Sequence, residues 1–280
     1  MACVDGSDDR GQGITVLYAA VAVRSFRRFS TYRTATLAGV FTNSVFGVIY
    51  SYAYLALWHQ RPDAGGYDAT DAVTYVWLGQ ALLMTVALWG GGTTDDLAER
   101  IRTGDVAIDL YRPVGLIGWY LAGDLGRAAY HVLARGVAPT ILGLLLFDIA
   151  LPATPAAAVG FVISLALAVV TSFGIRFLVA CSAFWLMDQT GIRMLSGVLA
   201  IFLSGMTLPL VIFPEPLRSI ALALPWASYL QTPADIWLGQ RSGTAILDGL
   251  AVQALWIAVL LTLCHLTLGA ATRKVVVQGG

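Results

Sequence analysis

Long apolar runs without a charge alternate along the chain with short polar segments. Five runs contain no Asp, Glu, Lys or Arg over 21 to 27 residues: Thr34–Trp58, Ala72–Thr94, Ile149–Ile175, Met194–Pro214 and Gly249–Thr272. A helix needs about 20 mainly apolar residues to cross a hydrocarbon core about 30 Å thick. Each run is long enough for one crossing, so the pattern predicts an all-α integral membrane protein.

One further span is predicted from a shorter run with a charged side. Residues 136–147 are uncharged, but they cover only about 18 Å of helix at 1.5 Å per residue. Upstream, four residues fall within about 80° of one helix face at 100° per residue: Asp124, Arg127, His131 and Arg135. We expect one long helix over 116–147. Its charged face would line an inward-open vestibule or a partner contact, or would only solvate a protruding helix end.

The pattern as a whole predicts one transmembrane domain over residues 1–280. Its six spans are expected at about 34–58, 72–93, 116–147, 156–180, 193–213 and 248–269. Arg176 lies near the inner end of the fourth span, where we expect it to snorkel toward water. Between the fifth and sixth spans, four prolines within 214–243 predict an external re-entrant hairpin of short helices.

Basic residues identify the segment before the first span and the orientation of the chain. Residues 14–33 are typical of an amphipathic helix in the membrane interface, with arginines facing anionic headgroups: Arg24, Arg27, Arg28 and Arg33. The alternative is a positive flank that only fixes orientation. With the N-terminus inside, fourteen of the seventeen Lys and Arg residues lie inside. This bias predicts that both termini are cytoplasmic.

Small or polar residues recur at four-residue spacing in two predicted spans. They are Gly39, Asn43, Gly47 and Ser51 in the first span and Ser196, Ala200 and Ser204 in the fifth. Small residues let membrane helices approach closely, and an Asn side chain can hydrogen-bond across such a contact. The stripes predict close packing. Three alternatives remain open: packing within the chain, an interface with another subunit, or the lining of a pathway.

The loop between the second and third spans, residues 93–115, holds eight charged residues, whereas only 12% of the chain is charged. Its first half predicts a short helix with Thr93 or Thr94 as N-cap and Gly104 as a left-handed C-cap. Leu97 and Ile101 lie four residues apart and give this helix a narrow apolar edge. Apolar and polar residues then alternate from Val106 until a proline stops the pattern. We expect this loop to be cytoplasmic and to bind a partner protein.

Catalytic and metal-binding motifs are missing from the sequence. There is no phosphate-binding G-x-x-x-x-G-K-[ST] segment, and the single lysine is Lys274. The three histidines are far apart, and the three cysteines (Cys3, Cys181 and Cys264) imply neither a disulfide framework nor a metal site. A net charge of zero suggests no nucleic-acid partner. We expect no cofactor, no metal and no catalysis in this chain.

The order of these features resembles the membrane (permease) subunits of type-2 ABC transporters, the ABC-2 family of bacterial exporters. The segment Gly104–Pro113 follows the pattern G-D-x-x-x-x-L-x-R-P of one branch of these permeases. Later segments are also similar to that branch: Ala183-Phe184-Trp185 with Asp188, Ser204-Gly205, Pro209-Leu210 and Phe213-Pro214.

The resemblance implies a pathway formed with a second permease, identical or homologous, in a bacterial plasma membrane. Two copies of a separate ATP-binding subunit would bind ATP and Mg, and would power export of an amphipathic or lipid-like small molecule. The loop 93–115 would be the coupling loop, moving with the interfacial helix as one lever. Its expected ATPase contacts are Leu97, Arg100, Ile101, Arg102, Asp105, Asp109 and Arg112, with Leu97 and Ile101 in a groove of the ATPase.

Two other functional classes remain as alternatives. A standalone secondary carrier would need inverted repeats and buried ionisable groups, and neither is clear in the sequence. An intramembrane lipid-modifying enzyme would need catalytic polar residues at one depth, and the nearest approach is Asp124, Arg127 and His131.

Overall fold

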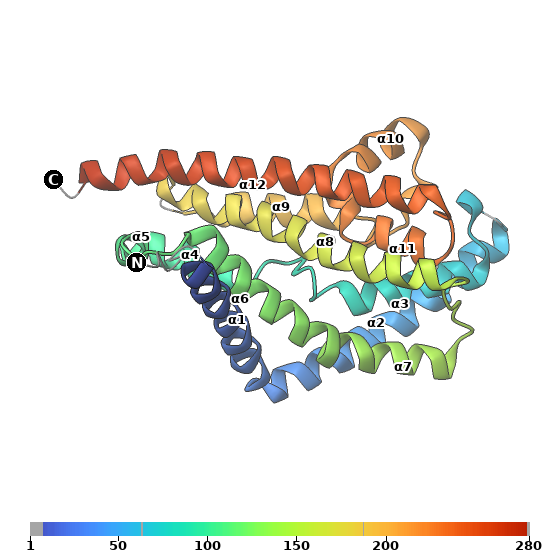
Figure 1. Ribbon diagram of the computed structural model, residues 1–280. Coiled ribbons are helices and arrows are strands. Elements are labelled where there is room, and N and C mark those ends of the chain that lie inside the picture. Colours follow the sequence, from blue (N-terminus) through green and yellow to red (C-terminus); the bar gives the residue numbers. More distant parts are fainter. Residues whose placement is uncertain (1–7, 63, 187, 279–280) are drawn as a thin grey trace, which may run out of the picture.

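The computed structural model describes residues 8–62, 64–186 and 188–278, and the side chains of 13–62, 64–186 and 188–273. These residues form helices and connecting turns, with no strand among them. Cys3 and the side chains of Arg10 and Lys274, which some of the predictions include, lie outside the described residues. Figure 1 shows an elongated bundle, with α4 and α5 at the same end as the C-terminus.

Four described helical segments are long and apolar enough to cross a membrane. They are α2 (Arg33–Gln60), the segment Leu116–Leu146, the segment Pro155–Phe184 and the part of α12 over Thr244–Arg273. The segment Leu116–Leu146 joins α6 (Leu116–His131), the π-helical turn η2 (Val132–Gly136) and α7 (Val137–Leu146). The four lie where the first, third, fourth and sixth spans were predicted. Helix α12 (Thr244–Gln278) runs along α8 (Pro155–Cys181), as Figure 1 shows.

The second and fifth predicted spans are not single long helices. Helix α3 (Ala69–Leu82) and helix α9 (Thr190–Leu203) each have 14 residues. After α3 the backbone turns through residues 83–92, where Ala87 and three consecutive glycines, at 90, 91 and 92, have positive φ angles. After α9, Gly205 also has a positive φ angle, and the 3₁₀ turn η4 (Leu210–Ile212) follows. An uncharged run does not require a continuous helix when the protein itself supplies partners for the freed backbone groups.

Helix α1 (Asp8–Ser30) packs along α6 and turns at Thr31 and Tyr32 into α2. It corresponds to the predicted interfacial helix and begins earlier than expected. A Cβ atom built on Gly126 of α6 would overlap the carbonyl oxygen of Ala22, so glycine is required for this close approach. The four arginines of the prediction, Arg24, Arg27, Arg28 and Arg33, are all exposed. The position of α1 in a membrane interface stays a prediction.

Short helices follow α9, as predicted for residues 214–243. They are α10 (Glu215–Ala223), the 3₁₀ turn η5 (Pro225–Ser228) and α11 (Gln231–Trp237). Beneath them, the Gln231 side chain donates to Tyr67 and to Asp235 at 3.0 and 2.8 Å. Tyr67 follows the 3₁₀ turn η1 (Ala64–Gly66), so this polar cluster ties the loop after α2 to α11.

The charged loop over residues 93–115 contains two helices, α4 (Thr93–Thr103) and α5 (Val106–Leu110). Gly104 ends α4 in the predicted left-handed conformation, with φ 83°. The predicted threonine N-cap is wrong, because Gly92 occupies the N-cap position. Thr93 donates instead to the carbonyl oxygen of Tyr120 at 3.2 Å. The alternating segment after Gly104 is a single helical turn.

Candidate functional site: a loop fastened by a buried ion network

The apolar edge of α4 docks inside the chain. Leu97 is fully buried and Ile101 is buried beside it, in a cluster that includes Ile117 of α6 and Phe177 of α8. The expectation that these two side chains enter a partner's groove is therefore corrected: their surface is used by this chain's own α6 and α8. Burial of such side chains stabilises the docking of α4 by roughly 1.5–3 kcal/mol each.

Asp109 fastens α5 to α4. Its side chain is 95% buried, pairs with Arg100 and lies 3.3 Å from Arg112. Arg100 also donates to the carbonyl oxygen of Asp105 at 3.1 Å. Asp109 therefore holds the loop together and offers little surface to a partner, in contrast to the prediction, whereas the side chain of Arg100 is 33% exposed and its contact with a partner stays a prediction.

The exposed face of the loop differs from the one predicted. Arg102, Asp105 and Arg112 are exposed, as a partner contact requires. Two apolar residues that the sequence argument omitted are exposed as well: Ile108 at 61% and Tyr111 at 90%. The available signal was an isoleucine and a tyrosine in a charged loop. The sequence argument did not predict a helix over this alternating segment. It therefore did not place the two side chains on a common face.

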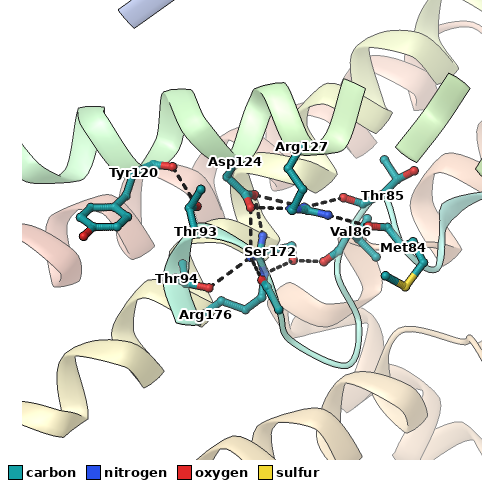
Figure 2. A network of polar contacts seen from close by, with 11 residues as sticks. Met84, Thr85, Val86, Thr93, Thr94, Tyr120, Asp124, Arg127, Ser172 and Arg176 are labelled. Carbon is teal, nitrogen blue, oxygen red and sulfur yellow. Dashed lines mark hydrogen bonds and ion pairs between the residues drawn. The ribbon is translucent and has the colours of Figure 1, made fainter. Parts of the chain in front are cut away.

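A buried network of charges lies directly beneath this loop. Asp124 of α6 has no exposed surface and accepts hydrogen bonds from Arg127 of α6 and Arg176 of α8 (Figure 2). The Arg127 Nε is 2.7 Å from Oδ1 of Asp124, and the Arg176 Nη2 is 2.6 Å from Oδ2. The network contains one carboxylate and two guanidinium groups, so it needs further acceptors.

Backbone carbonyl oxygens of the turn after α3 are those acceptors. Arg127 donates to the carbonyl oxygens of Met84 and Thr85 at 2.6 and 2.9 Å. Ser172 of α8 donates to the carbonyl oxygen of Val86. An unpaired carbonyl inside a membrane costs several kcal/mol. These side chains therefore allow residues 83–92 to leave the helical conformation inside the protein.

Arg176 connects the network to α4. Its guanidinium donates to the hydroxyl oxygens of Ser172 and Thr94 at 3.1 and 3.3 Å. It therefore joins α8, α6 and the first turn of α4 in one place, as Figure 2 shows. The expected snorkelling of Arg176 toward water is wrong, because acceptors within the protein hold the side chain in a buried position.

The charged face of the third helix does not line an open vestibule. Asp124, Arg127 and His131 are buried, and Arg135 is half-buried. The His131 ring packs edge-on against Phe29 and Tyr130. Arg135 lies over Gly39 of α2, where a Cβ atom would overlap its guanidinium. The face is covered because α1, α2, α8 and the turn after α3 pack around it.

Both small-residue stripes pack within the chain. Gly39, Asn43, Gly47 and Ser51 are all buried, and Asn43 donates to the carbonyl oxygen of Gln80 in α3 at 3.1 Å. In the other stripe Ala200 and Ser204 are buried and Ser196 is half-buried. The buried members of both stripes therefore pack within the chain, whereas the assignment of Ser196 to a permease interface or pathway stays a prediction.

A comparison with known families identifies the architecture. The family described as ABC-2 family transporter protein matches residues 23–279, whereas no curated protein and no solved structure matches the chain. Permeases of this family are transport subunits in the membrane and work with an ATP-binding partner subunit. Given the four long apolar helices, the chain belongs to the ABC-2 family and is a multi-pass permease subunit of an ABC transporter.

Proposed function

We propose that this permease forms an export pathway for an amphipathic or lipid-like small molecule together with a second, identical or homologous permease. Two copies of an ATP-binding subunit would hold ATP and Mg and contact α4 and α5. In this proposal the complex lies in a bacterial plasma membrane with both termini cytoplasmic. The observation that supports it is an exposed apolar and aromatic surface on a loop whose inner side is held by contacts with α6 and α8.

The exposed surface has the composition of a protein interface. Ile108 and Tyr111 are exposed on a loop whose exposed charged residues include Arg112 and the ion pair of Arg102 with Glu99. Aromatic residues and arginine are enriched at interfaces, and a few buried anchors carry most of the binding energy. Tyr111 and Ile108 would be these anchors when an ATPase covers the loop.

Attachment of the loop to the spans supports a coupling role. Thr94 in the first turn of α4 accepts from Arg176, which is bound to Asp124 of α6. On the outer side of α4, Asp96 pairs with Arg28 of α1. A displacement of α4 by nucleotide-driven closure of the ATPases would therefore move α1, α6 and α8 together, as one state of a two-state change.

The two alternative functions have less support. A carrier or a lipid-modifying enzyme would use Asp124 as a reactive or ion-coupling group. Four arginine hydrogen bonds occupy its two carboxylate oxygens. His131 is directed into an aromatic contact with Phe29 and Tyr130 instead.

The test is co-purification, in mild detergent, of the tagged chain with a co-expressed ATP-binding subunit. The double variant Ile108→Asp/Tyr111→Asp should lower the affinity for the ATPase at least tenfold, since each lost anchor of this kind costs more than about 1 kcal/mol. Leu151→Asp is the control, because Leu151 is 70% exposed and belongs to the connection between α7 and α8, which Figure 1 shows at the end opposite to α4 and α5. Substitution of Leu97 and Ile101 would not test ATPase contact, because both side chains are buried and their loss would destabilise the permease itself.

Transport is tested separately in proteoliposomes that contain the purified complex. ATP should drive net movement of a fluorescent, lipid-like probe across the bilayer, and Ile108→Asp/Tyr111→Asp should abolish this movement. Purification of the chain without any ATPase, or full binding by the double variant, would contradict the coupling proposal. ATPase binding without probe movement would contradict only the substrate class.

A further inference from the structure

An open groove of about 630 Å³ lies between α1, α4, α5 and α6. Helix α1 contributes one continuous face to it, because its lining residues recur three or four positions apart. This face is apolar in its first half and carries arginines in its second half. The lining residues of α1 are Leu17, Ala20, Val21, Arg24, Ser25 and Arg28.

The groove has an excess of positive charge. Asp96 pairs with Arg28, and Asp109 pairs with Arg100 and Arg112, so both carboxylates of the lining are already engaged. The remaining formal charge of the described lining residues is +2, because four arginines face two aspartates: Arg24, Arg28, Arg100, Arg112, Asp96 and Asp109.

Arg24 is the arginine of this groove that has no partner. It is exposed, and it makes no ion pair or hydrogen bond with the residues whose side chains the structure describes. Arg112 also keeps donors available, because it contacts one oxygen of Asp109, at 3.3 Å, and the ring of Trp119. A guanidinium group has five N–H donors in a planar fork that fits a phosphate or a carboxylate. The groove therefore offers donors to an anion from α1 and from the loop 93–115.

Apolar side chains lie beside these guanidinium groups. Trp119 of α6 is half-buried in the groove. Leu17 is 36% exposed, and Ile14, three residues earlier on the same face of α1, is 46% exposed. An anion with an attached apolar chain would cover these side chains, whereas a small inorganic anion would leave them in water.

We propose that this groove binds a phosphate monoester, with Arg24 as the main contact of the phosphate group. A phosphate monoester carries a charge of about −1.5 to −2 at pH 7 and three acceptor oxygens, so it balances the excess charge of the groove. A monoester on an apolar body, of which phosphatidic acid is an example, would use the guanidinium groups and the apolar side chains together. The site does not depend on which molecule the transporter exports.

Three probes test the ligand class by isothermal titration calorimetry of the full-length protein in a neutral detergent. Short-chain phosphatidic acid is a monoester with apolar chains, glycerol phosphate is a monoester without them, and short-chain phosphatidylglycerol is a diester with the same chains. Wild-type protein should bind the phosphatidic acid at one site and about tenfold more tightly than the phosphatidylglycerol, because the diester lacks one charged acceptor oxygen.

Two arginine variants test the assigned contact. Arg24→Gln should lower the affinity for phosphatidic acid by about 10- to 100-fold, the range expected for a hydrogen bond between charged groups. Arg27→Gln is the matched control, because Arg27 is exposed on the same helix but does not line the groove. Its effect should stay below about threefold at about 0.15 M salt, where exposed charges more than about 8 Å apart are largely screened.

Glycerol phosphate distinguishes the two sources of the phosphate group. Tighter binding of phosphatidic acid would support a lipid or a lipid-like monoester as the ligand, and equal binding would support a water-soluble one. Equal losses in Arg24→Gln and Arg27→Gln, or no saturable binding of either monoester, would overturn the proposal.

The neighbouring ATPase surface provides one further outcome. If no monoester binds and Arg24→Gln instead weakens ATPase binding, the groove belongs to the ATPase interface and the proposal is wrong. The titrations themselves contain no ATPase, so failure of this inference is distinguishable from failure of the proposed function.

Discussion

Arg176 donates two hydrogen bonds to the carboxylate of Asp124, at 2.6 and 3.2 Å, and so connects the C-terminal part of α8 to α6. Both residues are buried: Asp124 has no exposed surface and Arg176 is 9% exposed. A buried pair of this kind stabilises little in net terms, but removal of one partner leaves an uncompensated charge. The pair therefore matters most for the geometry that it imposes on the segments around it.

Asp124→Asn should destabilise the protein by about 3–5 kcal/mol, because Arg127 and Arg176 would remain buried without their counter-charge. The measurement is thermal or denaturant unfolding of the purified chain in one detergent. Asp95→Asn is the control: Asp95 is 42% exposed and lies 3.8 Å from Arg193, so its loss should cost less than about 1 kcal/mol. Equal effects of the two variants would contradict the assigned role of Asp124.

Arg127→Lys should loosen the turn after α3. A lysine has one ammonium group and cannot reproduce the fork that reaches Met84, Thr85 and Asp124 together. Amide hydrogen exchange of residues 83–92 should become faster, while exchange in α12 stays unchanged. Arg193→Lys, at an exposed arginine, is the matched control, and unchanged protection of residues 83–92 in Arg127→Lys would contradict the prediction.

Gly126→Ala should weaken the contact between α1 and α6. The added methyl group would overlap the Ala22 carbonyl oxygen, and overpacking of this kind costs about 1–3 kcal/mol. Gly197→Ala in α9 is the opposite case, because nothing lies within 4 Å of a Cβ atom there. That control should stabilise the helix by up to about 1 kcal/mol. The measurement is the unfolding curve of each variant. Unchanged stability of Gly126→Ala would show that α1 is not closely packed against α6.

Stability should depend on pH through Asp235, which lies outside the four candidate spans. Burial raises the pKa of its carboxyl group, and hydrogen bonds from Tyr67 and Gln231 and the charge of Arg241 oppose this only in part. A raised pKa in the folded state gives a stabilisation that is complete below the unfolded pKa of about 3.9 and is lost as the pH rises through the folded value.

The expected result is that wild-type unfolding temperatures fall, relative to Asp235→Asn, as the pH is raised from about 4. Asp235→Asn removes the titration and keeps a side chain of similar size, so it is the reference at each pH. Burial and the neighbouring Asp235 also raise the pKa of Tyr67, which therefore remains a proton donor throughout this range. A constant difference between the two proteins at all pH values would contradict the assignment.

Residues close in sequence account for the predictions that the structure reproduces. Glycine at position 104 ends α4, because the left-handed conformation costs glycine nothing. The 31-residue segment from Leu116 to Leu146 follows from helical spacing of its apolar and charged residues. The charge-free runs identify a helical membrane protein, because length and polarity alone decide whether a helix can cross a bilayer.

Tertiary packing decided where each of these elements faces. The sequence places Leu97 and Ile101 on one edge of α4, but only the docked α6 and α8 show that this edge is inside. The sequence likewise places Asp124 and Arg127 on one face, but not the carbonyl oxygens of Met84 and Thr85 that receive Arg127.

The interruption of the second predicted span also depends on tertiary packing. A helix ends inside a membrane only where distant side chains replace its lost hydrogen bonds, and Arg127 and Ser172 are far from residues 83–92 in the sequence. Local sequence therefore determined that this chain is helical, apolar and equipped with a charged loop. The three-dimensional structure alone decided which charges are buried together and which apolar residues remain exposed.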